Sequence, residues 1–188
     1  QLMQLTEAID FCVEHAEEYG LDMTNVVVFG SSAGAILTGQ YGALLANPEY
    51  RAALQIMPNI DPDCIRCLVV DDAPFHTEKF NWKMKAMMGN FLQTVDMNSQ
   101  QAQLFNAYAW FNNQMKPCFF DAGPKDGFPE DMQACADKLT ELGVQNELYI
   151  PENKDLPHGF LNLARTDEQA AEVERQLIDF MKRATDLA

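Results

Sequence analysis

The chain has 188 residues, of which 47% are hydrophobic, so it is long and apolar enough to form one globular domain with a substantial core. Its formal net charge is −15, from 28 acidic and 13 basic residues. Nucleic acids and anionic membrane surfaces are bound by clustered Lys and Arg, so we expect neither as a partner. We also expect no membrane-spanning segment, because no stretch approaches the ~20 apolar residues that a span needs.

The cysteines indicate reduced thiols. There are five, an odd number scattered over predicted helices and strands, which favours a reducing and therefore cytoplasmic compartment. Cys64 and Cys67 form a C-x-x-C pair, but no second Cys or His pair stands at zinc-site spacing, so we interpret them as core residues. No spacing in the chain calls for a metal or an organic cofactor.

The first half of the chain predicts two strands separated by helices. Apolar residues recur at helical spacing from about residue 5 to 16, and Gly20 follows as a stop signal. A buried strand is expected over 25–29, then a helix over about 33–47 that Pro48 closes, and a second strand over 66–70. Residues 75–113 are rich in Met, Phe and Trp without strand signals, which predicts a helical lid or cap inserted between core strands.

The second half continues the alternation. A third strand is expected over 117–121, and a fourth over 147–150 follows a helix that ends at Gly143. Thr166 followed by Gln169 predicts a capping box at the start of the last helix. Strands alternating with helices imply crossover connections, so the predicted fold is a single α/β domain over 1–188, a mostly parallel sheet with helices on both faces.

The pentapeptide Gly30-Ser31-Ser32-Ala33-Gly34 lies where the first strand turns into a helix. In a G-x-S-x-G turn, small residues two before and two after the serine relieve the crowding of a tight bend that lifts the hydroxyl above the sheet. Ser32 is therefore the candidate nucleophile, and the N–H of Ala33 is the predicted oxyanion-hole donor.

A serine nucleophile needs an imidazole to take its proton and a carboxylate to orient that imidazole. Parallel sheets gather such groups in the loops after their strands. The loop after the third strand has Asp126, and the loop after the fourth has His158, in Pro157-His158-Gly159-Phe160. The order Ser, Asp, His is the order that a hydrolase turn of this kind predicts.

Alternatives to these assignments stay open. Asp72, after the second strand, and Asp121, at the end of the third, compete with Asp126 for the role of the acid. His76 is a runner-up base, because it follows the second strand close to Asp71 and Asp72. His15 lies on the first amphipathic helix, where it is expected to be solvated or packed along the helix side.

With these motifs the sequence resembles the α/β-hydrolase superfamily, specifically the small serine carboxylesterases of the hormone-sensitive-lipase and acetyl-esterase type. The matching elements are Gly30-Ser31-Ser32-Ala33-Gly34, the strand and loop over 117–126, and His158-Gly159-Phe160. The resemblance implies Ser32 as nucleophile, Asp126 as orienting acid and His158 as base. It covers nearly all of the chain but only the C-terminal part of the usual fold, because the His-Gly-Gly type loop and four upstream strands have no counterpart here.

The expected function is hydrolysis of carboxylic esters, with small acyl esters as substrates and an acyl-enzyme on Ser32. A peptidase or amidase on the same scaffold is an alternative. Another is a catalytically impaired fragment that acts as an interaction module, self-associating through the exposed edge of its first strand. The Met and aromatic residues of 75–113 either line an acyl pocket or, for most of them, simply pack the inserted helices.

Overall fold

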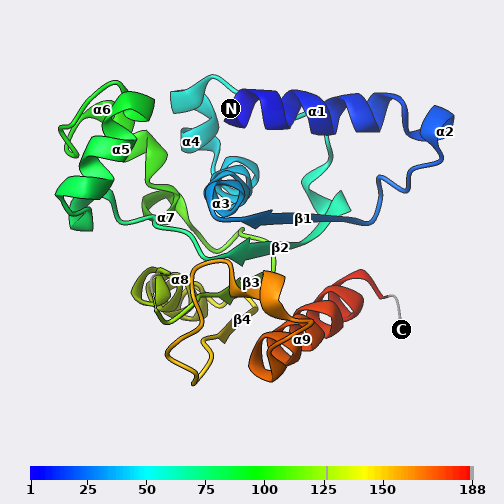
Figure 1. The fold of residues 1–188 in the computed structure, drawn as a ribbon. Helices are drawn as coiled ribbons and strands as arrows, with labels where there is room; N and C mark the ends of the chain where they lie inside the picture. The colour runs from blue at the N-terminus through cyan, green and yellow to red at the C-terminus, as the bar shows by residue number, and fades with distance from the viewer. Residues whose placement is uncertain (126, 187–188) are drawn as a thin grey trace.

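The structure is a computed structural model that describes residues 1–125 and 127–186 (Figure 1). Strands alternate with helices along the chain, as the sequence predicts. The strands are β1 (Val26–Ser31), β2 (Ile65–Asp71), β3 (Cys118–Asp121) and β4 (Asn146–Tyr149). The α-helices are α1 (Leu2–Glu14), α2 (Ala16–Tyr19), α3 (Ala33–Ala46), α4 (Pro48–Leu54), α5 (Trp82–Leu92), α6 (Gln100–Phe105), α7 (Ala107–Trp110), α8 (Pro129–Glu141) and α9 (Glu168–Thr185). Short 3-10 helices lie at η1 (Pro62–Cys64), η2 (Thr77–Lys79) and η3 (Phe160–Leu163).

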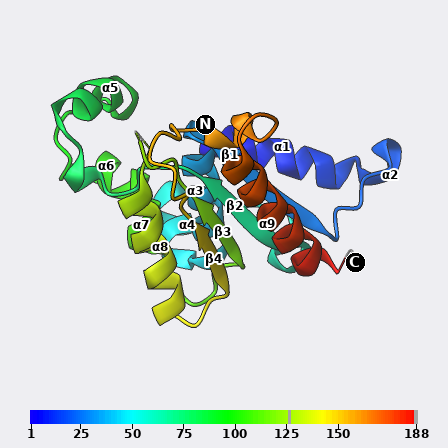
Figure 2. The ribbon, with the colours of Figure 1, turned by 60° about the horizontal axis from the view of Figure 1, so that its bottom comes forward.

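The four strands form one parallel sheet in the order β1-β2-β3-β4, which confirms the predicted parallel α/β fold. Each strand pairs with the next strand along the chain, and a helical segment connects the two. Figure 2 shows the sheet with α8 and α9 beside it. The carboxyl ends are in register, with Ser31 beside Asp71 and Asp71 beside Asp121. Side chains that follow β1, β2 and β3 are therefore brought to one edge of the sheet.

Side chains of the sheet alternate between two cores. Leu68, Val70 and Phe120 face the larger core, which includes residues of α1, α3 and α8. Cys67, Val69 and Phe119 face the smaller core, which they share with α9. Helices therefore cover both faces, and each fully buried aliphatic or aromatic side chain contributes ~1.5–3 kcal/mol by burial.

The prediction of a buried first strand is wrong for most of β1. Only Val28 of this strand is buried, and Phe29 is 54% exposed. The reason is the strand order, which makes β1 an edge of the described sheet, whereas β2 lies between β1 and β3 and is buried along nearly its whole length.

The helix predicted over about 33–47 does end before Pro48, as expected: α3 stops at Ala46, Asn47 is extended, and Pro48 begins the next helix. It is the first residue of α4, where its missing N–H costs no hydrogen bond. The side chain of Asn47 caps this helix by accepting hydrogen bonds from the N–H groups of Glu49 and Tyr50.

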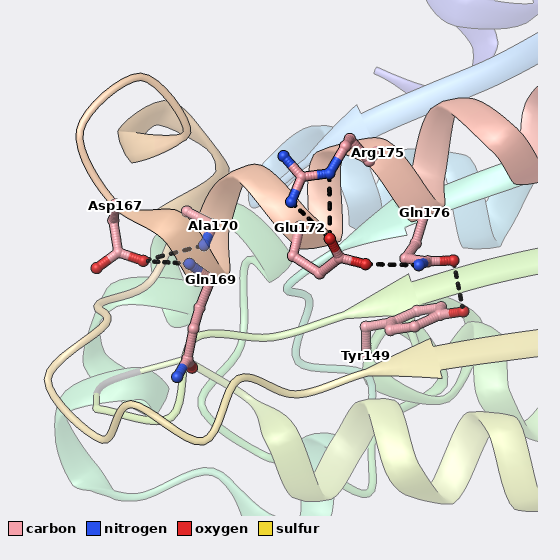
Figure 3. A network of polar contacts seen from close by, with 7 residues as sticks. All are labelled: Tyr149, Asp167, Gln169, Ala170, Glu172, Arg175 and Gln176. Carbon is pink, nitrogen blue, oxygen red and sulfur yellow. Dashed lines mark hydrogen bonds and ion pairs between the residues drawn. The ribbon is translucent and has the colours of Figure 1, made fainter.

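The predicted capping box at the last helix is also wrong. The N-cap of α9 is Asp167, whose carboxylate accepts from the N–H groups of Gln169 and Ala170 (Figure 3). The Thr166 hydroxyl instead donates to the carbonyl of Leu163. A carboxylate is the stronger acceptor at the positive end of a helix, which favours Asp167 over its neighbour.

A polar network joins α9 to β4. The Tyr149 hydroxyl donates to Gln176 at 3.3 Å, and the Gln176 amide donates to Glu172 at 2.7 Å (Figure 3). Arg175 donates to the same Glu172 carboxylate. The strand that precedes the predicted catalytic histidine is thus attached to the last helix.

Residues 75–113 form helices α5, α6 and α7 between β2 and β3, as predicted. Figures 1 and 2 both show α5 and α6 to one side of the sheet. Two buried side chains anchor α6 to the rest: Gln40 of α3 donates to the carbonyl of Phe105, and the Tyr50 hydroxyl of α4 donates to that of Leu104.

All five cysteines are free thiols. Cys67 is fully buried in the smaller core, whereas Cys64 packs against the larger one, so the C-x-x-C pair does not act as a unit. Burial raises the pKa of the Cys67 thiol to about 12, which keeps it protonated and unreactive at neutral pH. Among residues 1–125 and 127–186, no helix has the length and apolar character needed to cross a membrane.

Candidate active site

Ser32 stands between β1 and α3 in a strained backbone conformation. Its φ of 56° and ψ of −117° lie outside the regions that residues with a Cβ normally occupy, at a cost of ~1–3 kcal/mol. The Ser32 N–H donates to the carbonyl of Asp71 at 2.8 Å, so the bend is fixed to the neighbouring strand β2. This is the sharp strand-to-helix turn that the pentapeptide predicts.

Only one of the two flanking glycines is needed for space. A Cβ at Gly30 would overlap the carbonyl of Gly34 and the side chain of Thr38. A Cβ at Gly34 would meet no atom within 4 Å. The expected crowding is therefore one-sided, and it falls on the residue two before the serine.

The structure brings Ser32 and His158 together, although they are 126 positions apart in the sequence. The Nε2 atom of His158 lies 2.8 Å from the Oγ atom of Ser32. The imidazole stands in the loop after β4 with its side chain 30% exposed, and the ring of Phe128 packs edge-on against it at 5.6 Å. A ring nitrogen at this distance can accept the hydroxyl proton, which is the contact that activates a serine.

The other ring nitrogen of His158 faces a carboxylate. Its Nδ1 atom lies 3.0 Å from the Oδ2 atom of Asp72, which is fully buried. Burial raises the pKa of Asp72, while hydrogen bonds from the N–H groups of Gly123 and Phe128 and the charge of His158 act against that rise. A carboxylate beside Nδ1 favours the tautomer with its proton there, which makes Nε2 the acceptor for the Ser32 hydroxyl.

The predicted acid Asp126 lies outside the described residues, so its role stays a prediction. Its described neighbours Gly123 and Phe128 do lie beside His158 and Asp72. The competing residue Asp121 is fully buried at the end of β3 and pairs in register with Asp71. Burial raises the pKa of the Asp121 carboxyl well above its ordinary value, and the adjacent Asp71 raises it further.

The other two histidines lie elsewhere. His76 is buried and paired through its Nδ1 atom with Asp131 at the start of α8, and its ring packs 4.3 Å from that of Tyr108. It therefore links the inserted helices to α8. His15 is stacked on Phe11 along α1, as expected of a helix-side residue.

Ala33, the predicted oxyanion donor, is the first residue of α3. The hydrogen bonds of this helix begin with the Ile36 N–H, which donates to the Ser32 carbonyl, so the Ala33 N–H has no partner within the helix. It stands at the positive end of a 14-residue helix, where developing negative charge is favoured.

A cavity of about 300 Å³ opens beside Ala33. It lies between the first turns of α3 and the inserted helices, and its lining is mostly apolar: Gln1, Ala33, Ile36, Leu37, Gln40, Met87, Met88, Phe91 and Phe105. Four of the Met and aromatic side chains considered for an acyl pocket are among these. Others, such as Phe80, Met97 and Phe111, are instead buried in the larger core.

Asp72, which the sequence offers as an alternative acid, is the carboxylate that the described residues place beside His158. Its signal was the Asp71-Asp72 doublet directly after a buried strand, which predicts two carboxylates at the functional edge of the sheet. The pattern did not show which of them reaches the histidine, because that depends on the positive φ of Asp72, 63°.

Comparisons with known proteins agree with this fold. A family model described as alpha/beta hydrolase fold matches residues 1–162. A search among curated proteins returned no match.

Several solved structures are similar in fold. A carboxylesterase from Lactobacillus plantarum WCFS1 has 18% identity and a TM-score of 0.79, with 100% of this chain and 68% of that one covered. Esterase B from Lactobacillus rhamnosis has 15% identity and a TM-score of 0.77, with 99% and 61% covered. A structure from a study of two Rhizomucor miehei esterases has 16% identity and a TM-score of 0.70, with 98% and 59% covered. The chain thus spans about three fifths to two thirds of each.

The one-sided crowding at the turn predicts different effects for two matched substitutions. Gly30→Ala should lower the free energy of unfolding by ~2 kcal/mol or more, because a backbone carbonyl must move to admit the methyl group. Gly34→Ala should change it by less than ~1 kcal/mol, in the stabilising direction, because alanine is favoured in a helix. Urea unfolding of both variants measures the difference, and equal losses would contradict the one-sided geometry.

The burial of the Asp121 carboxyl predicts that the substitution Asp121→Asn stabilises the fold in a pH-dependent way. A pKa raised in the folded state means that the stability contribution of Asp121 is present below its unfolded pKa of ~3.9 and is lost as the pH rises. Asp121→Asn should therefore raise the free energy of unfolding at pH 7 by ~1 kcal/mol or more, and by little near pH 4. Thermal or urea unfolding from pH 4 to 8 tests this, and a destabilisation that is equal at every pH would show that charge burial is not the cause.

Proposed function

Since the chain belongs to the alpha/beta-hydrolase fold family, we propose that it is a serine hydrolase that cleaves carboxylic esters. The observation that carries the proposal is the 2.8 Å contact between Ser32 Oγ and His158 Nε2 at a strained strand-to-helix turn. The similar structures are those of a carboxylesterase and of esterases, which supports esters as the substrate class for this chain too.

The reaction proposed has two halves. In the first, His158 takes the Ser32 proton as Oγ attacks the ester carbonyl, and the resulting oxyanion accepts a hydrogen bond from the Ala33 N–H. The intermediate collapses, His158 gives the proton to the departing alkoxide, and an acyl group stays on Ser32. In the second half, water attacks the acyl group with His158 again as base, which releases the carboxylic acid and restores Ser32. Asp126 serves as the acid that orients His158.

Small acyl esters are the proposed substrates. The cavity is lined by Ala33, whose N–H is the proposed oxyanion donor, and its volume of about 300 Å³ is at the small end for ligand sites. Thioethers of Met87 and Met88 adapt their shape to different acyl groups.

We assign the lid role to residues 75–113. The Gln40 and Tyr50 hydrogen bonds hold α6 against α3 and α4, whereas α5 exposes large apolar side chains, including Trp82 at 75% and Met87 at 62%. A segment that is anchored through α6 and that presents an apolar surface on α5 suits a cover for a hydrophobic substrate. The free thiols support the reducing, cytoplasmic compartment expected from the sequence.

The nucleophile is tested by labelling with a fluorophosphonate probe and by turnover of short-chain esters. Wild-type protein should incorporate one probe per chain, and Ser32→Ala should lose both labelling and at least ~10³-fold in kcat/KM. Ser31→Ala is the matched control, since it removes the neighbouring exposed hydroxyl of the same turn. Folded wild-type protein that neither labels nor turns over esters would refute the proposal, and comparable turnover of matched amides would favour a peptidase or amidase.

We also propose that the chain self-associates through the edge of β1. Phe29 is 54% exposed on this strand, and an apolar edge with unpaired backbone groups is a template for strand pairing. Sedimentation should show concentration-dependent dimers that Phe29→Lys weakens about tenfold. Met57→Lys, at a residue 70% exposed in the loop between α4 and η1, is the control. A monomer at all concentrations, or equal effects of the two variants, would exclude this edge.

A further inference from the structure

The carboxylate of Asp72 contacts three groups of the candidate site. Its Oδ2 atom lies 3.0 Å from His158 Nδ1. The same carboxylate accepts hydrogen bonds from the Gly123 N–H at 3.0 Å and from the Phe128 N–H at 2.6 Å. One buried side chain after β2 therefore contacts the loops that follow β3 and β4.

The two N–H donors bracket residues 124–127, the stretch that contains the predicted acid Asp126. A carboxylate that accepts from both ends of this stretch fixes the distance between them, and charge-assisted bonds of this kind are among the stronger ones in proteins. Asp72 is thereby bonded to the chain both before and after this stretch.

The packing around this carboxylate leaves no space for larger residues. A Cβ at Gly127 would overlap both carboxylate oxygens of Asp72, and a Cβ at Gly123 would overlap the carbonyl of Pro157 and crowd the His158 N–H. The β3 loop thus fits between Asp72 and the His158 loop because it carries glycine at the two points of closest approach.

The backbone of Asp72 is itself constrained. Its N–H donates to the Asp121 carbonyl at 3.0 Å, and its φ of 63° is in the left-handed region, which Asp and Asn adopt more readily than most residues. The carboxylate is consequently aimed at the histidine by the sheet rather than by a mobile loop.

We propose that Asp72 is a positioning residue for the hydrolytic reaction, a second carboxylate that holds His158 in its Nδ1–H tautomer, stabilises the imidazolium form and fixes the loop that bears Asp126. The inference rests on the proposed function, in which His158 is the base. It assigns to Asp72 part of the orientation of His158, a role that the sequence assigns to Asp126. A carboxylate 3 Å from an imidazolium favours the charged ring, so removal of the Asp72 charge should make the imidazolium form of His158 less favourable.

The first test follows the ring-proton NMR titration of His158, which needs no substrate, in a Ser32→Ala background. Asp72→Asn should move the titration midpoint to lower pH by about one unit or more, because the imidazolium loses a nearby negative charge. Asn retains the left-handed backbone and one acceptor oxygen. The control is Asp121→Asn, the same change at a buried carboxyl one strand away, which should leave the midpoint within a few tenths of a unit.

Kinetics of the full active chain give the second readout. Asp72→Asn should lower kcat at least tenfold with little change in KM and move the acid limb of the kcat/KM profile to lower pH. The loss should be smaller than the ~10⁴-fold seen when the sole orienting carboxylate of a serine triad becomes an amide. Asp72→Gly, which tolerates the same φ, repeats the measurement if the amide variant folds poorly.

The outcomes separate a positioning role from loop fixation, and both from failure of the proposed function. If Asp72→Asn lowers the melting temperature but leaves the His158 midpoint and the pH profile unchanged, Asp72 only fixes the loop and the proposal is overturned. The proposal also fails if Asp126→Asn moves the His158 titration midpoint and Asp72→Asn does not. If wild-type protein shows no probe labelling and no turnover, the proposed function fails, while the titration still decides whether Asp72 acts on His158.

Discussion

Two backbone hydrogen bonds continue the parallel ladder past the ends of β1 and β2, and the candidate site depends on them. The Ser32 N–H donates to the Asp71 carbonyl, and the Asp72 N–H donates to the Asp121 carbonyl. Both donor residues have positive φ, which costs ~1–3 kcal/mol at each and persists only because the neighbouring strand holds the N–H. The chain therefore leaves the sheet abruptly after each strand, and the side chains of Ser32 and Asp72 reach opposite nitrogens of the same imidazole.

The carboxyl edge of the sheet shows how environment gives one residue type two different states. Asp72 and Asp121 are both fully buried, and burial raises the pKa of each. Asp72 accepts two backbone N–H bonds and faces a histidine, which favours its ionised form. Asp121 faces Asp71, another carboxyl, which favours its protonated form. The free-energy cost of burying a carboxylate is thus offset at Asp72, which contacts the predicted base His158, and is not offset at Asp121, which faces Asp71.

Much of this arrangement could be predicted from the sequence because it is local. Hydrophobic periodicity predicted the strands, the order of elements predicted parallel pairing, and the pentapeptide predicted the turn at Ser32. Two predictions failed: β1 is half-exposed because of its place in the sheet, and Asp167 rather than Thr166 caps the last helix. The contact of Asp72 with His158 could not be predicted either, since it depends on contacts between three strands that no single motif encodes.

The two predicted reacting residues follow opposite edges of the described sheet, Ser32 after β1 and His158 after β4, while the strands between them supply buried carboxylates. Edge strands open locally more readily than central ones, because fewer backbone hydrogen bonds and apolar contacts hold them. The contact between Oγ and Nε2 is therefore sensitive to opening at either edge. Asp72 follows the buried central strand β2, accepts a hydrogen bond from the loop after β3 and faces His158. It therefore connects the histidine to the buried interior of the sheet and counteracts this sensitivity.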